Sequence, residues 1–145
     1  MGEWKQLCTF YLDDGYFGIE VNEVQEVLRD QQMIPVPLAP SEVEGLINLR
    51  GSIVVAVDLR RRLGMPRRPD HHPPVNLIVS TGDGPVSLLA DQVGEVVEVA
   101  PDQFEPPPEN LEGVSRDLIT GVYKLEEGLL QLLDAQKATL VEIDR

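Results

Sequence analysis

Short apolar segments, each bounded by glycine, proline or acidic residues, follow one another along most of the chain. Apolar runs of this length are typical of β-strands, and glycine and proline mark the turns between them. The expected strands cover residues 7–12, 16–20, 75–80, 86–90, 93–99, 119–125 and 129–133. Helical periodicity does not persist over any long segment, so the pattern predicts an all-β fold, mainly strands with a few short helices.

Two of the connections between these strands have the composition of tight turns. Residues 13–15 (Asp-Asp-Gly) lie between the first two strands, where Gly15 is expected to take the positive φ that a tight hairpin requires. Residues 126–128 (Glu-Glu-Gly) separate the last two strands in the same way. Both segments therefore predict β-hairpins.

A first short helix is predicted after residue 21. Asn22 can cap it, and Gln25 stands three residues later, in the position of a capping box. The apolar face of this helix would consist of Val24, Val27 and Leu28. Glu26 would then point to the exposed side.

Two further helices are predicted, each after an aspartate that follows an apolar strand. Asp58 can cap a helix over residues 59–63, and Gly64 can end it. Asp134 can begin a closing helix that runs to about Ile143. The chain thus repeats one arrangement, a strand that ends in a capping aspartate.

This repetition extends to the hairpins that precede the helices. Residues 45–58 and residues 121–134 have the same length, both run from glycine to aspartate, and their apolar positions correspond. Gly51 marks the turn of the first hairpin. Two similar hairpins in one chain indicate two similar β units, and we expect two small barrels.

The length of 145 residues fits a single domain with a substantial core. Asp and Glu number 25 against 12 Lys and Arg, which gives a formal net charge of −13. Such a charge repels nucleic acids and anionic lipid surfaces, so neither is expected as a partner.

Five of the basic residues are concentrated in one short segment: Arg60, Arg61, Arg62, Arg67 and Arg68. A run of this kind is usually the solvated end of a helix and the loop after it, and this is the interpretation that we favour. The alternative is a basic patch that meets an acidic partner.

Membrane insertion and secretion are not expected. The first residues lack a basic segment followed by an apolar one, and no apolar stretch approaches the roughly 18 residues of a membrane span. Cys8 is the only cysteine and lies in a predicted strand, which favours a buried thiol in a reducing compartment. A cytoplasmic protein is therefore predicted.

Catalytic and metal-binding patterns are also lacking. His71 and His72 are the only histidines, and adjacent histidines in a proline-flanked loop seldom bind one metal ion together. The serines lie in no nucleophile motif, and Gly82-Asp83-Gly84 lacks the lysine and the strand-to-helix setting of a phosphate loop. We expect no enzyme, no metal and no cofactor.

The most distinctive polar segment is residues 48–51 (Asn-Leu-Arg-Gly), which interrupts two apolar strands. Asn48 can hydrogen-bond the local backbone, and Arg50 presents a planar fork of donors that suits a carboxylate. Glu26 is the candidate acceptor. The alternative is an ordinary surface ion pair worth about 0–1 kcal/mol.

Residues 45–60 resemble the signature of the CheW family, in which a glycine is followed by Asn-Leu-Arg-Gly and then by an apolar strand that ends in Asp-Leu-Arg. Further segments that resemble the family follow in order: residues 17–19, 24–27, 36–37, 88–93, 119–121 and 132–134. The likeness covers about residues 7–140, so residues 1–145 are expected to form a single CheW-like domain.

The resemblance implies two five-stranded β-barrel subdomains that share a hydrophobic core. It implies a non-enzymatic adaptor that couples methyl-accepting chemoreceptors to the histidine kinase CheA, at receptor arrays on the inner face of the membrane. The receptor tip would bind at Val21, Val24, Glu26, Val27, Gly45, Asn48, Arg50 and Leu88. The regulatory domain of CheA would bind at Leu38, Val43, Glu44, Ile53 and Val55.

Two residues depart from the family pattern. Ser87 replaces the usual glycine and is expected to narrow the receptor groove, and Ala90 replaces a larger valine. An adaptor of a pilus or another taxis-like kinase array is therefore an alternative. A small-barrel module that binds a ligand or nucleic acid is a second one, although only 5% of the residues are aromatic.

Overall fold

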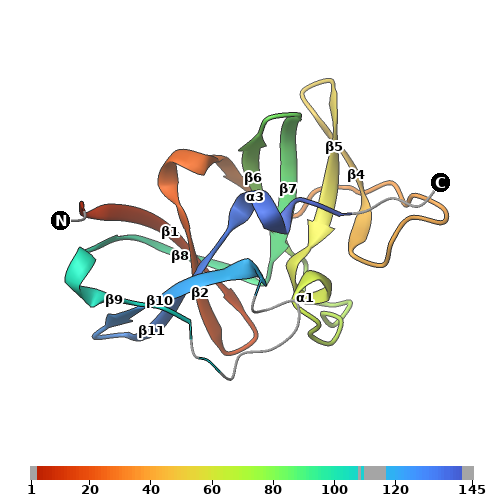
Figure 1. Ribbon diagram of the computed structural model, residues 1–145. Coiled ribbons are helices and arrows are strands. Elements are labelled where there is room, and N and C mark those ends of the chain that lie inside the picture. Colours follow the sequence, from red (N-terminus) through yellow and green to blue (C-terminus); the bar gives the residue numbers. More distant parts are fainter. Residues whose placement is uncertain (1–2, 108, 110–116, 142–145) are drawn as a thin grey trace.

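The computed structural model describes residues 3–107, 109 and 117–141, which form two mixed β-sheets with short helices between strands (Figure 1). Sheet A contains, in spatial order, β8 (Gln92–Val99), β1 (Lys5–Leu12), β2 (Gly15–Glu20), β11 (Gly128–Leu133), β10 (Ile119–Leu125) and β9 (Phe104–Glu105). Sheet B contains β3 (Val24–Leu28), β6 (Val75–Thr81), β7 (Gly84–Ala90), β5 (Ser52–Asp58) and β4 (Val43–Leu49). The helices are η1 (Val21–Glu23), α1 (Leu59–Arg62), η2 (Pro101–Gln103) and α3 (Ala135–Ala138). The predicted all-β class is confirmed.

Each sheet combines strands from both halves of the chain. Sheet A takes β1 and β2 from the beginning and β8 to β11 from the end, whereas sheet B joins β3 to β5 with β6 and β7. Parallel pairs join the two contributions, Gly18 with Leu132 in sheet A and Ser87 with Ala56 in sheet B. Sheet B is therefore built from the continuous segment 24–90, whereas sheet A needs strands from both ends of the chain.

The internal repeat predicted for the two hairpins is confirmed at the level of register. Gly45 pairs with Ala56 in β4–β5, and Gly121 pairs with Leu132 at the corresponding place in β10–β11. Each hairpin has a bulge just before its glycine. The helices that follow begin alike, because the side chains of Asp58 and Asp134 each accept a backbone N–H of the first turn.

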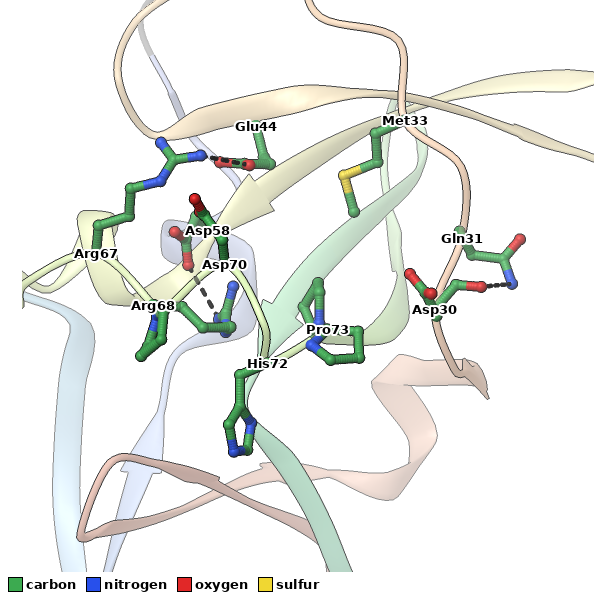
Figure 2. A pocket seen from close by; sticks show the side chains of 12 residues that line it. Asp30, Gln31, Met33, Glu44, Asp58, Arg67, Arg68, Asp70, His72 and Pro73 are labelled. Atoms are coloured by element: carbon green, nitrogen blue, oxygen red, sulfur yellow. Dashed lines mark hydrogen bonds and ion pairs between the residues drawn. The ribbon is translucent and has the colours of Figure 1, made fainter.

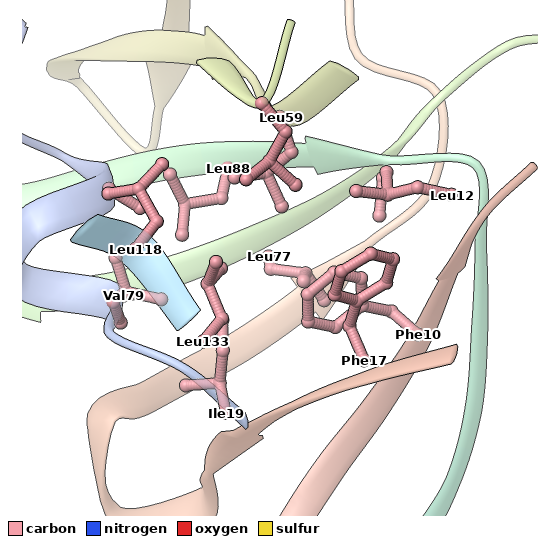
Figure 3. Packing of buried hydrophobic residues seen from close by; sticks show 14 of the residues in the cluster. Phe10, Leu12, Phe17, Ile19, Leu59, Leu77, Val79, Leu88, Leu118 and Leu133 are labelled. Carbon is pink, nitrogen blue, oxygen red and sulfur yellow. The ribbon is translucent and has the colours of Figure 1, made fainter. Parts of the chain in front are cut away.

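The core has three parts, and the largest lies between the sheets (Figure 3). It joins side chains of sheet A, such as Phe10 and Phe17, to side chains of sheet B, such as Leu77 and Leu88. Smaller clusters fill each sheet separately, around Leu7, Tyr123 and Leu130 in sheet A and around Ile47, Val54 and Ile78 in sheet B. This is the shared core that was expected of two barrel subdomains.

Sheet A departs from the expected five strands because the two-residue strand β9 adds a sixth. Phe104 pairs with Tyr123, and Glu105 pairs with Val122. In sheet B the corresponding position is occupied by a single bridge between Ile34 and Leu46. Each unit thus ends in a short segment that pairs with the first strand of its hairpin. This segment forms the two-residue strand β9 in sheet A and a single bridge in sheet B.

The helix predicted from Asn22 is wrong. Only the 3-10 turn η1 forms, without a side-chain cap, and the chain then continues as the edge strand β3. Val24 pairs with Val79 and Val27 with Leu77 in the neighbouring strand β6. β-Branched valines suit this pleated surface, and the hydrogen bonds offered by β6 outweigh a helix that is too short to be stable alone.

The closing helix is shorter than predicted. Asp134 caps it as expected, but α3 ends at Ala138, and residues 142–143 lie outside the described part of the chain. The guanidinium of Arg62 caps the end of α3, because it donates to the carbonyl oxygens of Lys137, Ala138 and Leu140 at 3.0–3.2 Å. No helix among the described residues has the length and apolar character needed to cross a bilayer.

Candidate protein-binding surfaces

The turn between β4 and β5 holds Arg50 in an unusual backbone conformation. Arg50 has a φ of 51° and Gly51 a φ of 90°, and these two residues form the whole loop of the hairpin. Positive φ at both positions is the geometry of a type I′ turn, in which glycine and asparagine are the usual residues. Asn48 stabilises the turn, because its Oδ1 accepts the backbone N–H of Gly51 at 2.8 Å. An arginine here costs roughly 1–2 kcal/mol, which marks the position for a role beyond folding.

The Arg50 guanidinium donates to the Oε2 atom of Glu26 on β3, as predicted. The side chain of Arg50 is 68% exposed and that of Glu26 is 26% exposed, so the pair lies at the surface with its carboxylate half-buried. The hydrogen bond to Glu26 raises the pKa of Arg50, and the guanidinium stays charged. The pair joins the edge strand β3 to the β4–β5 turn, and it leaves donors of Arg50 free for a partner.

The other residues predicted to contact a receptor fall into two groups. Val21, Val24 and Val27 lie along the same edge as Glu26 and are partly exposed. Gly45 is buried, and a Cβ there would lie 2.7 Å from the carbonyl oxygen of Ile34. Glycine at this position therefore permits a close approach of two backbone segments.

Leu88 was wrongly placed on a groove wall. It is fully buried in the core between the sheets, where β7 is covered on both faces, so its side chain reaches no partner. Ser87 is fully buried as well, and its hydroxyl donates to Oδ1 of Asn76 at 2.9 Å. It cannot narrow a surface groove as predicted.

The residues predicted to contact the kinase lie on β4, on β5 and on the loop before β4, and two of them, Leu38 and Ile53, are exposed apolar residues. Leu38 is completely exposed and has a φ of 63°, a conformation that leucine rarely adopts. Ile53 is 64% exposed, whereas Val43, Glu44 and Val55 are half-buried.

Sequence reasoning missed two further exposed apolar residues of the loop before β4, Ile34 and Val36. Ile34 bridges to Leu46, so it lies in the same row across the sheet as Leu46 and its partner Val55. The alternation of apolar residues with prolines at residues 34–40 is the signal that could have revealed it. We name Ile34, Val36, Leu38 and Ile53 the proline-loop patch.

The arginine cluster is not a solvated helix end, because Arg60 and Arg68 are buried. Both bind Asp91, the residue that joins sheet B to sheet A between β7 and β8. Arg60 approaches Asp91 to 2.6 Å and Arg68 approaches it to 2.9 Å, while Arg68 also contacts Asp58 at 3.3 Å. The tertiary structure explains this burial. A buried guanidinium requires a carboxylate, and the end of β7 places Asp91 beside both arginines.

Asp91 also accepts the backbone N–H of Asp13 in the β1–β2 turn at 2.7 Å. That turn has its positive φ at Asp13 (55°), and the prediction for Gly15 is wrong. Burial would raise the pKa of Asp91, but the hydrogen bonds from Arg60, Asp13 and Arg68 outweigh it and hold the pKa below its usual value. Asp91 is thus a charged hub that fixes the two sheets to each other.

A hollow of about 400 Å³ lies beside this hub (Figure 2). Its two arginines are paired with carboxylates of the same hollow, Arg67 with Glu44 at 3.1 Å and Arg68 with Asp58 at 3.3 Å. Within the described residues, no group of three His, Cys, Asp or Glu side chains could hold a metal ion.

Burial raises the pKa of the Cys8 thiol, which agrees with the predicted buried cysteine.

These features define a class of protein that acts by presenting surfaces: two joined β units, a charged edge at Glu26 and Arg50, and an apolar patch nearby. The comparisons agree with this class. A family model described as a CheW-like domain matches residues 6–140. The chain therefore belongs to the CheW-like family, and the predicted resemblance is confirmed.

Similar proteins support the assignment over nearly the whole length. The chemotaxis protein CheW of Treponema pallidum is 29% identical over 139 residues, with 93% of this chain and 82% of that protein covered. CheW of Bacillus subtilis is 27% identical over 131 residues, with 90% and 84% covered. The crystal structure of the scaffolding protein TtCheW from Thermoanaerobacter tengcongensis matches with a TM-score of 0.86 at 25% identity, covering 98% of this chain and all of that one.

Proposed function

We propose that this chain is a non-enzymatic chemotaxis adaptor in the cytoplasm, which couples chemoreceptors to the histidine kinase CheA. The observation that carries the proposal is Arg50, held in a strained turn and aimed at Glu26 on the surface. Strain of this kind persists where a partner uses the geometry. Membership of the CheW-like family supports the same class of function.

The receptor face consists of Val21, Val24, Glu26, Val27, Asn48 and Arg50. Its apolar residues along η1 and β3 suit the apolar side of a helical receptor tip, and the charged pair fixes the orientation of the tip. Gly45, which was also predicted to contact the receptor, is buried, and it allows the segment around Ile34 to pack closely on β4.

The kinase face consists of the proline-loop patch together with Val43, Glu44 and Val55. Leu38 is fully exposed and Ile53 largely exposed, so their apolar side chains stay in contact with water unless a partner covers them. A β-barrel partner that packs against this corner of sheet B would bury them, with Leu38 as the protruding anchor.

Both faces share the β4–β5 hairpin, which explains how an adaptor without chemistry can transmit a signal. Arg50 stands at its tip, and Ile53 follows only a few residues later. A shift of the hairpin changes the contacts at both faces at once, so the receptor can favour one kinase state through differential binding.

Co-sedimentation with receptor-containing membranes and CheA tests the two faces separately. Arg50→Glu places two carboxylates together and is expected to lower receptor capture at least tenfold, while binding of CheA alone is retained. Leu38→Glu is expected to do the reverse. Arg61→Glu is the matched control, because Arg61 is exposed on α1 and belongs to neither face. Capture of receptor by Arg50→Glu at the level of Arg61→Glu would refute the receptor face.

A further inference from the structure

The internal repeat extends beyond the hairpins to the two edge strands, β3 and β8. β3 is the first strand of sheet B and pairs with β6, and β8 is the first strand of sheet A and pairs with β1. Residues 24–28 read Val-Gln-Glu-Val-Leu, and residues 93–97 read Val-Gly-Glu-Val-Val. Val24 and Val93 both pack against the shared core. β8 is therefore the counterpart of the strand that carries the proposed receptor face.

The second edge lacks the basic residue of the first. Glu95 on β8 corresponds to Glu26, but the turn that corresponds to Arg50 and Gly51 carries Glu126 and Glu127. Burial raises the pKa of Tyr16, and the charges of Glu127 and Glu95 raise it further. Acidic residues thus occupy both the strand and the turn at the positions where the receptor face has one acidic and one basic residue.

The edge at β8 also exposes apolar surface. Val96 is 58% exposed, and Glu95 and Glu98 flank it as exposed residues of the same strand. On the neighbouring strand β1, Tyr11 pairs with Gln92 of β8 and stacks on Tyr16, with ring centroids 5.2 Å apart. Among the described residues, no strand pairs with the outer side of β8.

An open edge strand can accept a further strand, and its charges decide which one. A second copy of this chain would bring its own Glu95 and Glu98 against the same carboxylates, which disfavours self-pairing. A segment with lysine or arginine would instead find opposite charges directly across the strand, each worth a modest gain. Charge complementarity therefore selects a basic partner.

We propose that β8 is a second docking edge, which takes an extended basic segment of another protein as an added strand. β8 has a bulge at residues 94–95, where its pairing with β1 shifts register. Paired residue by residue along the outer side of β8, the segment would place lysine or arginine opposite Glu95 and Glu98 and an apolar residue opposite Val96. This proposal goes beyond the adaptor function and does not require the receptor face, since Arg50 takes no part in it.

The test uses the full chain, labelled with ¹⁵N, and a blocked peptide in which Lys-Thr-Val-Lys is flanked by threonines. Amide shifts are expected along β8 and at the β10–β11 turn, and a peptide with glutamate in place of lysine should cause none. The double variant Glu95→Lys, Glu98→Lys is expected to weaken peptide binding about tenfold or more. The milder pair Glu95→Gln, Glu98→Gln should give an intermediate loss.

The control carries the same change of charge elsewhere, as Asp70→Lys, Asp83→Lys in two exposed loops. It should keep the affinity within about twofold, since direct pairing and not net charge is proposed. Equal losses in both double variants, shifts spread over other acidic surfaces, or no shifts at all would overturn the proposal. Arg50→Glu should leave peptide binding unchanged, so this test and the receptor test can fail independently.

Discussion

Asp91→Asn should destabilise the protein strongly, because the carboxylate of Asp91 is shared by two buried guanidiniums. Arg60 and Arg68 both bind it, and Asp13 donates its backbone N–H to the same group. The amide of asparagine keeps the size and one acceptor, but it removes the negative charge. Arg68 then keeps its ion pair with Asp58, whereas Arg60 loses the carboxylate that its guanidinium binds.

The expected magnitude follows from the burial of these groups. Breaking a buried ion pair by removal of one partner costs about 3–5 kcal/mol. Because asparagine is a conservative replacement, the free energy of unfolding should fall by about 3 kcal/mol. For a chain of this length, such a loss lowers Tm by about 6–12 °C. This is a large part of a total stability of about 5–15 kcal/mol.

The pH dependence gives an independent check. The pKa of Asp91 is lowered in the folded state, so its contribution is complete above the pKa of an unfolded aspartate, about 3.9. The contribution of Asp91 to stability is lost as the pH falls from about 3.9 through the lower pKa that Asp91 has in the folded protein. The wild type should therefore lose its advantage over Asp91→Asn only in acid, below about pH 4.

Calorimetry and urea unfolding, each at neutral and acidic pH, measure these quantities. Asp83→Asn is the control, because Asp83 is exposed in the β6–β7 turn. A Tm shift of Asp91→Asn no larger than that of the control, or a difference that persists unchanged in acid, would refute the view of Asp91 as the hub between the sheets.

Three further substitutions separate stability from binding. Gly45→Ala should destabilise the protein by about 1–3 kcal/mol in urea, since its Cβ would meet the carbonyl oxygen of Ile34 at 2.7 Å. Arg50→Asn should maintain or raise Tm, because asparagine tolerates a φ of 51°, while receptor co-sedimentation falls; a lower Tm would contradict the strain. Ser87→Gly should cost about 1–3 kcal/mol, because Asn76 loses its buried donor, and leave receptor capture unchanged; altered capture would show that this buried site shapes the surface.

Much of the fold could be predicted because turns, caps and alternation act over a few residues. The hairpins at 45–58 and 121–134, and the aspartates that cap the helices after them, follow from local composition. The pair of Arg50 and Glu26 was also predictable, although on wrong grounds. Glu26 reaches Arg50 from an edge strand and not from a helix.

The sequence by itself determined the mainly β class, the repeated hairpins and the family. Tertiary structure alone decided that residues 24–28 join a sheet, that Leu88 is buried, and that Arg60 and Arg68 serve Asp91. The reason is the distance along the chain between the residues that stabilise each feature. A turn is stabilised by its own few residues, whereas a strand at an edge, a buried leucine or a buried charge depends on partners supplied by distant segments, and here each sheet is assembled from both halves of the chain.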